Sequence, residues 1–275
     1  MRKFWSIILS LSFVLTACAA DQGEITVISR EEGSGTRSAF ISLSGVEAAG
    51  EDRTYVRAEI SSATAVVLQA VIGDKNAIGY LSVGAVNEQV KALSLDGAAP
   101  TAEAIAEGSY PLARSFYLVW KGAPTPGAED FLSFVQSRGG QAVVAEEGYV
   151  PIGSGDFESS YPQGLLPIAG SGSVAPLMEA LAEAYAAHNP ALRIEIQISD
   201  SSTGLSSLAA GLCELSMSSR ELTDRELARD LHAEQISKDG IAVIVNPQNP
   251  VDGLTMAQLR AIFMGQLRYW QQVAQ

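Results

Sequence analysis

Segments with the pattern of strands and segments with the pattern of helices alternate along most of this chain, and no other feature restricts its fold as strongly. Residues 241–246 form a short apolar run, which is typical of a buried strand. Residues 176–188 are rich in Ala, Leu and Glu with helical spacing, which indicates an amphipathic helix. Alternation of this kind predicts an α/β fold with largely parallel sheets.

The same patterns place the remaining elements. The N-cap of the helix at residues 64–72 is expected to be Ser62 or Thr64. Residues 153–167 are rich in Gly, Ser and Pro and are expected to form a linker. The expected strands are residues 25–29, 77–83, 91–95, 116–120, 193–198, 215–218 and 241–246, and the expected helices are residues 37–43 (a helix start), 64–72, 101–107, 128–136, 176–188, 203–212, 223–231 and 255–263.

The composition allows a substantial core and excludes some partners. The 275 residues suffice for one large domain or two medium ones, and 47% of them are hydrophobic. A formal net charge of −13 argues against non-specific binding to nucleic acid or to an anionic membrane surface, because polyanions are repelled. A single small anion is not excluded, because a local cluster of donors can outweigh the mean field.

The N-terminal segment has the features of an export signal. Arg2 and Lys3 precede an apolar run over residues 4–15, which is too short for a comfortable transmembrane span. The sequence Leu-Thr-Ala-Cys that ends at Cys18 resembles the bacterial lipobox, in which the cysteine becomes a lipid-modified N-terminus. We therefore expect a signal peptide over residues 1–17 and a lipid anchor to the cell membrane at Cys18. Ordinary secretion with an incidental cysteine is the alternative.

The other cysteine, Cys213, stands in an apolar stretch and is expected to be a buried small hydrophobe rather than a reactive thiol. Two cysteines cannot form a disulfide framework.

Small hydroxyl residues and glycines stand at the start of three expected helices, in residues 32–37, 170–174 and 201–204. A helix N-terminus offers free N–H groups and a partial positive charge, and small side chains let an oxyanion approach them. Arg30, which follows an expected strand, could add a forked contact to the same anion. Each feature has an ordinary explanation: the hydroxyls as plain N-caps, and Arg30 as a surface ion pair with a neighbouring glutamate.

Features that would indicate an enzyme are missing from the sequence. There is no phosphate loop of the Gly-Lys-Ser/Thr type, no dinucleotide fingerprint, no nucleophile elbow and no cluster with metal-ligand spacing. His188 and His232 are both expected at solvated helix ends. Asp200 and Asp239 lie near strand ends, where a turn-capping role is favoured over contact with a ligand. We expect neither catalysis nor a cofactor.

Several blocks of the chain together resemble the periplasmic phosphate-binding protein family, the solute receptors of phosphate ABC importers. The block at residues 27–40, VISREEGSGTRSAF, resembles the phosphate-binding loop of that family. The other matching blocks are AIGYLSVG at 77–84, GSGSVAPLMEA at 170–180, SDSSTGL at 199–205, LSMSSREL at 215–222, DGIAVIVNPQNP at 239–250 and LTMAQLRAIFMGQLRYW at 254–270. The resemblance covers nearly the whole chain after the signal segment.

The order of these blocks differs from that of the family. Residues 24–152 resemble the C-terminal half of the family and residues 167–275 its N-terminal half, which indicates a circular permutation. The segment 153–167 would then join the usual end to the usual beginning, and the new termini would fall after Trp270 and before Glu24. Permutation is tolerated where the original termini are close and the new break is exposed. A gene fragment spanning two tandem copies is the alternative.

The resemblance implies a two-lobe periplasmic-binding-protein-like (type II) α/β fold, with the ligand in a cleft between lobes that crossing strands join. One lobe is expected at residues 24–88 plus 247–275, the other at 89–152 plus 168–246, with crossings near 88–90 and 246–248.

The resemblance also implies the ligand residues. Arg30 and the loop after it match the phosphate-binding loop, and the serines at 201 and 202 match a serine at a helix start. Ser173 and Val174 stand where a hydroxyl or a backbone N–H is contributed. The full set is Arg30, Ser34, Gly35, Thr36, Ser173, Val174, Ser201, Ser202 and Ser219.

One position departs from the family. Many members have an aspartate where this chain has Ser219, and that carboxylate accepts the proton of the bound phosphate. Without it, the candidates for the proton acceptor are Glu32, Asp200 and Asp239, and Arg220 could add a positive contact. If none of these carboxylates points inward, discrimination against sulfate should be weaker.

The resemblance implies an extracytoplasmic receptor that captures inorganic phosphate and delivers it to the membrane permease of an ABC importer, with no nucleic-acid partner. A sensor or scaffold lipoprotein without a transport role, or a receptor for another tetrahedral oxyanion such as arsenate, is the alternative.

Overall fold

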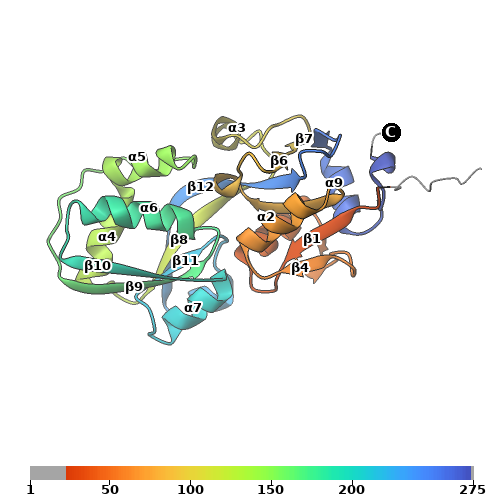
Figure 1. The fold of residues 1–275 in the computed structure, drawn as a ribbon. Helices are drawn as coiled ribbons and strands as arrows, with labels where there is room; N and C mark the ends of the chain where they lie inside the picture. The colour runs from red at the N-terminus through yellow and green to blue at the C-terminus, as the bar shows by residue number, and fades with distance from the viewer. Residues whose placement is uncertain (1–22, 274–275) are drawn as a thin grey trace, which may run out of the picture.

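The computed structural model describes residues 23–273, which form two α/β lobes joined along one mixed sheet (Figure 1). Nine strands of this part of the chain make up the sheet, in the order β10-β9-β11-β8-β12-β5-β1-β4 with β6 beside β12. We call residues 23–112 with 241–273 the first lobe and residues 113–240 the second lobe. The expected signal peptide at 1–17 and Cys18 lie outside the described residues.

The first lobe, at the right in Figure 1, packs helices against a parallel three-strand unit in which β1 pairs with both β4 and β5. Phe40 stacks on Tyr80 at 4.0 Å between ring centroids, and Phe263 meets Phe40 edge-on, so one aromatic group forms the middle of this core. Its elements are β1 (Thr26–Arg30), α1 (Gly35–Ser44), β2 (Glu47–Ala48), β3 (Glu51–Asp52), β4 (Glu59–Ser61), α2 (Thr64–Gly73), β5 (Ala77–Ser82), β6 (Lys91–Ala92), β7 (Ser94–Leu95), α3 (Ala102–Glu107), β13 (Gly253–Leu254) and α9 (Met256–Phe263).

The second lobe, at the left in Figure 1, has its own core, in which Phe131 and Phe134 meet the ring of Tyr185. Its elements are β8 (Ala113–Lys121), α4 (Pro126–Gln136), α5 (Arg138–Glu146), β9 (Gly164–Ser171), α6 (Ala175–Ala186), β10 (Leu192–Ser199), α7 (Ser201–Ala209), β11 (Leu215–Ser218) and α8 (Asp224–Leu227). Cys213 is buried beside α7, as expected, and burial raises the pKa of its thiol.

The lobes are joined by one long strand, β12 (Leu231–Val245). Its residues 231–240 pair antiparallel with β8 in the second lobe, and its residues 241–245 pair antiparallel with β5 in the first. The expected helix at 223–231 shrinks to the four residues of α8, and His232 lies in β12 rather than at a helix end. Residues 231–240 carry no continuous apolar run, so only their pairing with β8 makes them a strand.

The two cores place the changeover between lobes near residues 112–113 and 240–241 instead of the expected 88–90 and 246–248. Leu93, Leu95 and Leu112 pack in the same cluster as Phe40 and Phe263 of the first lobe, and so do Ile241 and Val243. In β12 the change of core coincides with the step from the largely polar residues 231–240 to the apolar run 241–245, whereas the resemblance placed the crossing at the end of that run.

The sheet is parallel only toward its ends. The pairs β10–β9, β9–β11, β5–β1 and β1–β4 are parallel, while β11–β8, β8–β12 and β12–β5 are antiparallel. The expected strand at 91–95 divides into β6 and β7, which pair with different partners. The N-cap of α2 is Ala63, with no side-chain bond, rather than Ser62 or Thr64. Thr64 instead accepts a hydrogen bond from Arg30.

The expected linker at 153–167 is fixed against the second lobe, and its last residues already belong to β9. The carboxylate of Asp130, a buried residue of α4, accepts hydrogen bonds from the backbone and hydroxyl of Ser160 at 2.6 and 2.8 Å and from the Ser159 hydroxyl at 2.8 Å. Tyr185 donates to the same carboxylate at 2.5 Å. Burial alone would raise the pKa of Asp130, but these hydrogen bonds lower it below its ordinary value.

The two ends of the described chain lie side by side in the first lobe. Glu24 forms an antiparallel bridge with Tyr269, and the backbone N–H of Ile25 donates to the carbonyl of Arg268 at 2.7 Å. Trp270 donates through its backbone N–H to Gly23 at 3.0 Å. Among residues 23–273, no helix has the length and apolar character that a membrane span requires.

Candidate anion-binding site

The N-terminus of α1 brings the first group of candidate residues to the boundary between the lobes. Ser34 is the N-cap, and its hydroxyl accepts from the backbone N–H of Arg37 at 3.3 Å. Gly35 and Thr36 form the first turn, and all three residues from Ser34 to Thr36 are buried. The first N–H groups of a helix have no acceptor within the helix, so this end carries donors and a partial positive charge.

The second lobe supplies the residues that face this helix end. Ser171 ends β9, and its hydroxyl accepts from the backbone N–H of Ser173 at 3.3 Å. Ser201 opens α7, and its hydroxyl accepts from the backbone N–H of Ser219 at 3.2 Å. The backbone N–H of Val174 is used within its own turn, where it donates to the carbonyl of Ser171 at 3.0 Å, and its side chain lies in the core.

Five buried hydroxyls from the two lobes meet here, and we call them the hydroxyl cluster: Thr36, Ser171, Ser173, Ser201 and Ser219. The Thr36 and Ser173 oxygens lie 2.6 Å apart, one from each lobe. Ser171 donates to Ser219 at 2.9 Å, and the Ser201 and Ser219 oxygens lie 3.4 Å apart. A hydroxyl both donates and accepts, so the cluster can turn its O–H groups toward an anion.

Gly35 allows the lobes to come this close. A Cβ atom at residue 35 would lie 2.4 Å from the Ser201 oxygen and 2.5 Å from the Ser219 oxygen, closer than such contacts can be. Gly33 is restricted twice, because its φ is +93° and a Cβ there would lie 2.8 Å from a carboxylate oxygen of Asp200. The absence of a side chain at both glycines therefore allows α1 to lie close to α7.

Next to the hydroxyl cluster lies a buried ion pair of Arg114 and Asp239. The sequence analysis named Asp239 as a candidate proton acceptor but did not single out Arg114. Arg114 donates to Thr36 Oγ1 at 2.8 Å through Nη1 and to Asp239 Oδ2 at 2.9 Å through Nε. Ser82 donates to the other oxygen of Asp239 at 2.9 Å. Burial raises the pKa of Asp239, and the Arg114 guanidinium and the Ser82 hydroxyl oppose that rise.

Comparison with known proteins identifies the kind of molecule that has this site. A family model described as a PBP superfamily domain matches residues 15–138 and 157–275. The phosphate-binding protein PstS 2 of Streptococcus agalactiae is 40% identical over 269 residues, which cover 94% of this chain and 92% of that one. This chain belongs to the PstS family of phosphate-binding proteins.

A solved structure extends the likeness to three dimensions. The crystal structure of the phosphate-binding protein of a phosphate ABC transporter from Streptococcus pneumoniae has a TM-score of 0.73 and 39% identity, over 91% of this chain and 99% of that one. The fold is therefore the α/β, periplasmic-binding-protein-like type II fold. The PstS protein of Bacillus subtilis matches differently, with 36% identity over 133 residues, which are 47% of this chain and 42% of that one.

Of the nine positions that resemble ligand residues of the PstS family, Thr36, Ser173, Ser201 and Ser219 belong to the hydroxyl cluster, with Ser34 and Gly35 beside them. Arg30 is buried but forms the ion pair with its neighbour, because its guanidinium donates to both oxygens of Glu31, at 2.7 and 2.6 Å. Arg30 lines a cavity of about 570 Å³ between the lobes, together with Gly172 and Asp200.

Ser202 lies at the edge of the site. Its backbone N–H donates to the carbonyl of Gly33 at 3.4 Å across the lobe boundary, and its hydroxyl accepts from Arg220 at 3.3 Å. Arg220 also forms a two-point ion pair with Glu226, and these bonds lower the pKa of Glu226 to about 2. Arg220 is thus held by a carboxylate on α8.

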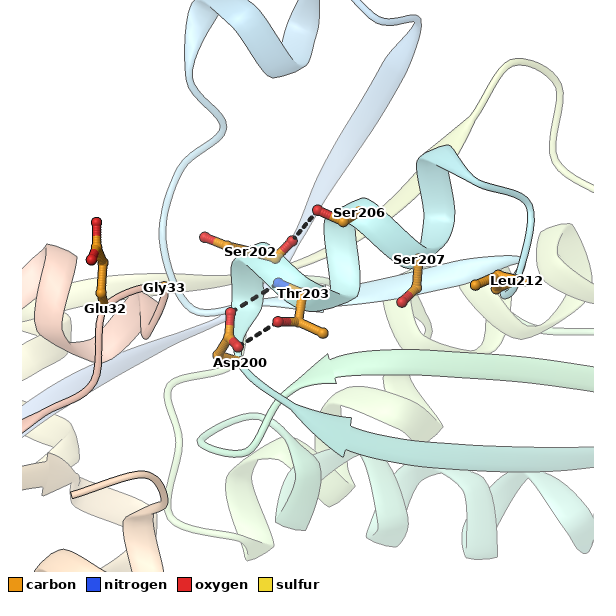
Figure 2. A pocket seen from close by; sticks show the side chains of 8 residues that line it. All are labelled: Glu32, Gly33, Asp200, Ser202, Thr203, Ser206, Ser207 and Leu212. Atoms are coloured by element: carbon orange, nitrogen blue, oxygen red, sulfur yellow. Dashed lines mark hydrogen bonds between the residues drawn. The ribbon is translucent and has the colours of Figure 1, made fainter.

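The three carboxylates considered as proton acceptors are all turned to other partners or to solvent. Figure 2 shows Glu32 and Gly33 on one side and Asp200 with Thr203 of α7 on the other. These residues line an open cavity of about 680 Å³. Glu32 is exposed. Asp200 caps α7 by accepting from the backbone N–H and the hydroxyl of Thr203 at 2.9 and 2.6 Å. Asp239 is occupied by Arg114 and Ser82.

Proposed function

We propose that this protein captures inorganic phosphate outside the cell and delivers it to the membrane permease of a phosphate ABC importer. The observation that carries the proposal is the hydroxyl cluster, which two lobes assemble from buried side chains at the start of α1 and α7, in a chain of the PstS family. Hydroxyls and helix N-termini are the donors that an oxyanion requires. The S. pneumoniae relative with this fold is itself described as the phosphate-binding protein of an ABC transporter.

In this proposal the phosphate oxygens accept hydrogen bonds from both lobes. The proposed ligands from the first lobe are Arg30, Ser34, Gly35 and Thr36, and those from the second are Ser173, Val174, Ser201, Ser202 and Ser219. Val174 has its N–H turned to Ser171, and Arg30 is held by Glu31, so each would have to change partners before it could contact the anion. The hydroxyls of the cluster need only rotate.

The number of donors is sufficient for a useful affinity. A hydrogen bond to a charged group contributes about 1.5–3 kcal/mol, and a micromolar dissociation constant corresponds to about −8 kcal/mol. A handful of such bonds therefore suffices after the cost of bringing the lobes together. The acidic surface does not prevent this, because contacts inside a closed cleft are screened less than contacts across the surface.

Capture would follow from a hinge motion of the two lobes at residues 112–113 and 240–241, where the chain passes from one lobe to the other. Bonds such as Thr36–Ser173 and Ser202–Gly33 span the lobe boundary and can form only when the cleft is closed. A ligand that contacts both lobes binds the closed form better than the open one, and this difference in affinity is what shifts the population.

We also propose that the chain is a circular permutation of the more familiar family order. Two observations support it: the match to the B. subtilis protein stops at about half of each chain, and residues 23–25 lie against residues 268–270, as a former connection there requires. The alignment with the S. agalactiae protein runs along nearly all of both chains, so those two share one order. This favours a permuted gene over a fragment of tandem copies.

The proposed location is the outer face of the cell membrane, with a lipid on Cys18. The support is the signal pattern of residues 1–17 and the lipobox-like sequence before Cys18. The test is fractionation of cells that express the full chain or its Cys18→Ser variant. The full chain should stay with membranes and carry lipid on Cys18 by mass spectrometry, and the variant should be released. Equal release of both would leave an ordinarily secreted protein.

The binding function is tested by calorimetric titration of residues 19–275, stripped of anion, with phosphate, and again in excess sulfate. One-to-one binding with micromolar or better affinity, together with a higher melting temperature, is expected. If phosphate gives no heat and no thermal stabilisation, the chain is a sensor or a scaffold instead. Arsenate in a parallel titration measures how far the site accepts other tetrahedral oxyanions, and tighter binding of arsenate than of phosphate would contradict the proposal.

A further inference from the structure

Arg114 lies where the chain passes from one lobe to the other, next to the hydroxyl cluster. It is the second residue of β8, and its side chain is only 3% exposed. The central carbon of its guanidinium lies over the ring of Phe116, 5.0 Å from the ring centroid. One flat face of the guanidinium is therefore covered by an aromatic side chain. A charged group in so buried a place needs partners on its polar sides, because desolvation of an unpaired charge is costly.

Arg114 has more N–H donors than the described residues accept. A guanidinium has five N–H donors. In this structure Nε donates to Asp239 and Nη1 to Thr36, while the Nη1 contact with the carbonyl of Ser219 is long, at 3.5 Å. Nη2 lies 2.8 Å from Asp239 Oδ2 in the ion pair, but it is buried and makes no well-aligned hydrogen bond to the described residues. Arg114 therefore has N–H groups that the described residues leave without an acceptor, on a guanidinium that already contacts Thr36 of the cluster.

Other arginines around the site are directed elsewhere. Arg30 donates to both oxygens of Glu31. Arg37 is bound to Asp52, and Arg220 is bound to Glu226 and Ser202. Among the arginines of residues 23–273, Arg114 is the one whose guanidinium donates to a hydroxyl of the cluster, namely Thr36 Oγ1.

We infer that Arg114 contacts the bound oxyanion directly and is the principal positive charge of the site, and that Asp239 and Ser82 position it. The inference rests on the proposed function. Thr36 and Ser173 would turn their hydroxyls to the anion, and Arg114 would donate to it through the N–H groups that Asp239 leaves free. A charge-assisted bond in a buried place is stronger than one between neutral groups.

The position of Arg114 also connects the anion to the hinge. Arg114 and Asp239 are directly paired across the β8–β12 ladder, at the last part of β12 that belongs to the second lobe. Ser82 ends β5 and pairs with Ile241, the first residue of β12 in the first lobe. The contacts thus begin in the first lobe at Ser82, pass through Asp239 and Arg114 of the second lobe and return to the first lobe at Thr36. Thr36 continues them to Ser173 of the second lobe.

The test compares two variants that break the same ion pair. Asp239→Asn removes the carboxylate but keeps the guanidinium, while Arg114→Gln combined with Asp239→Asn removes both charges and keeps groups that can hydrogen-bond. Arg138→Gln, which changes an exposed arginine of α5 paired with Asp156, controls for the loss of an ion-paired arginine outside the hydroxyl cluster. Calorimetry gives the phosphate affinity of each protein, and the melting temperature without ligand reports the fold.

If Arg114 contacts the anion, the double variant loses about tenfold to a hundredfold in affinity, the effect of one charge-assisted bond. Asp239→Asn loses less than the double variant, because the guanidinium keeps its charge although it loses the partner that positions it. Arg138→Gln stays within a few-fold of the parent. Equal losses in Asp239→Asn and the double variant would show that the ion pair matters only for structure, and no loss in either would also overturn the inference. If the double variant does not fold, Arg114→Lys takes its place in the test. Its phosphate affinity is expected to fall at least several-fold, and an affinity equal to that of the parent would contradict the inference. Failure of the parent itself to bind phosphate would instead refute the proposed function.

Discussion

Thr36 and Ser173, 137 residues apart in the sequence, bring their hydroxyl oxygens to 2.6 Å across the boundary between the two lobes. Thr36 comes from the first turn of α1, and Ser173 from the turn that precedes α6. Each hydroxyl is buried, so neither can exchange this partner for bulk water while the lobes are closed. The two hydroxyls meet only when the lobes are closed, and the same hydroxyls can bind an anion. Closure of the lobes and anion binding are therefore linked through this pair.

Replacing either hydroxyl should weaken phosphate binding with little effect on the fold. Thr36→Val keeps the shape of the side chain and removes its oxygen, and Ser173→Ala does the same on the other side. Each change removes one donor to the anion, which corresponds to about 1–3 kcal/mol and to roughly fivefold to a hundredfold in the dissociation constant. Calorimetry measures the affinity, with Ser109→Ala, an exposed serine of the first lobe, as the control. Unchanged affinity in both variants would place the ligand elsewhere.

A methyl group at residue 35 should prevent the lobes from closing. Gly35→Ala would place its Cβ against the Ser201 and Ser219 oxygens, which belong to the other lobe. Relief of that overlap costs about 1–3 kcal/mol in the closed form only, so phosphate affinity should fall roughly fivefold to a hundredfold. The melting temperature without ligand should hardly change.

The matched control for this change is Gly73→Ala, at the end of α2, where nothing lies within 4 Å of the added atom. Small-angle scattering with saturating phosphate should show compaction of the parent and of Gly73→Ala, and less of Gly35→Ala. Full compaction of Gly35→Ala at parent affinity would refute the closure argument.

Local signals explain what the sequence predicted well. The helices expected from residues 37 and 203 begin two residues earlier, at Gly35 and Ser201, behind the capping residues Ser34 and Asp200. Capping is a preference that acts within a few residues and needs no knowledge of the rest of the chain. The strand at 215–218 has the ends that the sequence predicts, because Leu and Met alternate with Ser along it, which is a strand pattern.

Pairings between distant segments explain the rest. Arg114 and Asp239 are 125 residues apart, and no motif beside either residue indicates that the two side chains form a pair. The first ten residues of β12 have a polar pattern and become a strand through β8 alone. The same limit applies to the linker at 153–167, whose composition indicates flexibility although Asp130 holds it.

The carboxylate of Asp130 should make the stability of the protein depend on pH below neutrality. Its pKa in the folded state is lower than the ordinary value of 3.8, so its contribution is present above that value and is lost as the pH falls through the folded pKa. Asp130→Asn should lower the free energy of unfolding by about 1.5–3 kcal/mol at pH 7, the worth of a hydrogen bond to a charged group. The difference from the parent should shrink as the pH falls below about 4.

Urea titrations at a series of pH values measure this effect. Glu158→Gln changes an exposed carboxylate of the same segment and serves as the control, with parent-like stability expected throughout. A deficit of Asp130→Asn that stays constant from pH 7 to pH 3 would mean that shape rather than charge holds the segment.

Ser219 should set how well the site tells phosphate from sulfate. Its hydroxyl lies within the cluster, where it can accept a hydrogen bond from the P–OH of phosphate or donate a hydrogen bond to sulfate. The carboxylates of Glu32, Asp200 and Asp239 are not turned to the cluster. A carboxylate left without a hydrogen-bond donor when sulfate binds would cost about 1–3 kcal/mol, and the parent has no carboxylate turned to the cluster. We therefore expect the dissociation constants of sulfate and phosphate to lie within about an order of magnitude of each other.

Ser219→Asp supplies that acceptor. A carboxylate accepts from the P–OH of phosphate but faces only lone pairs of sulfate, so one of its oxygens stays unsatisfied when sulfate binds. Phosphate affinity itself should fall, because a negative charge enters the site, but sulfate affinity should fall by at least about tenfold more. Competition calorimetry with both anions gives the ratio, and Ser219→Asn, which has the same shape without the charge, should leave it near the parent value. A parent that already rejects sulfate would mean that one of the three carboxylates turns inward when the anion binds.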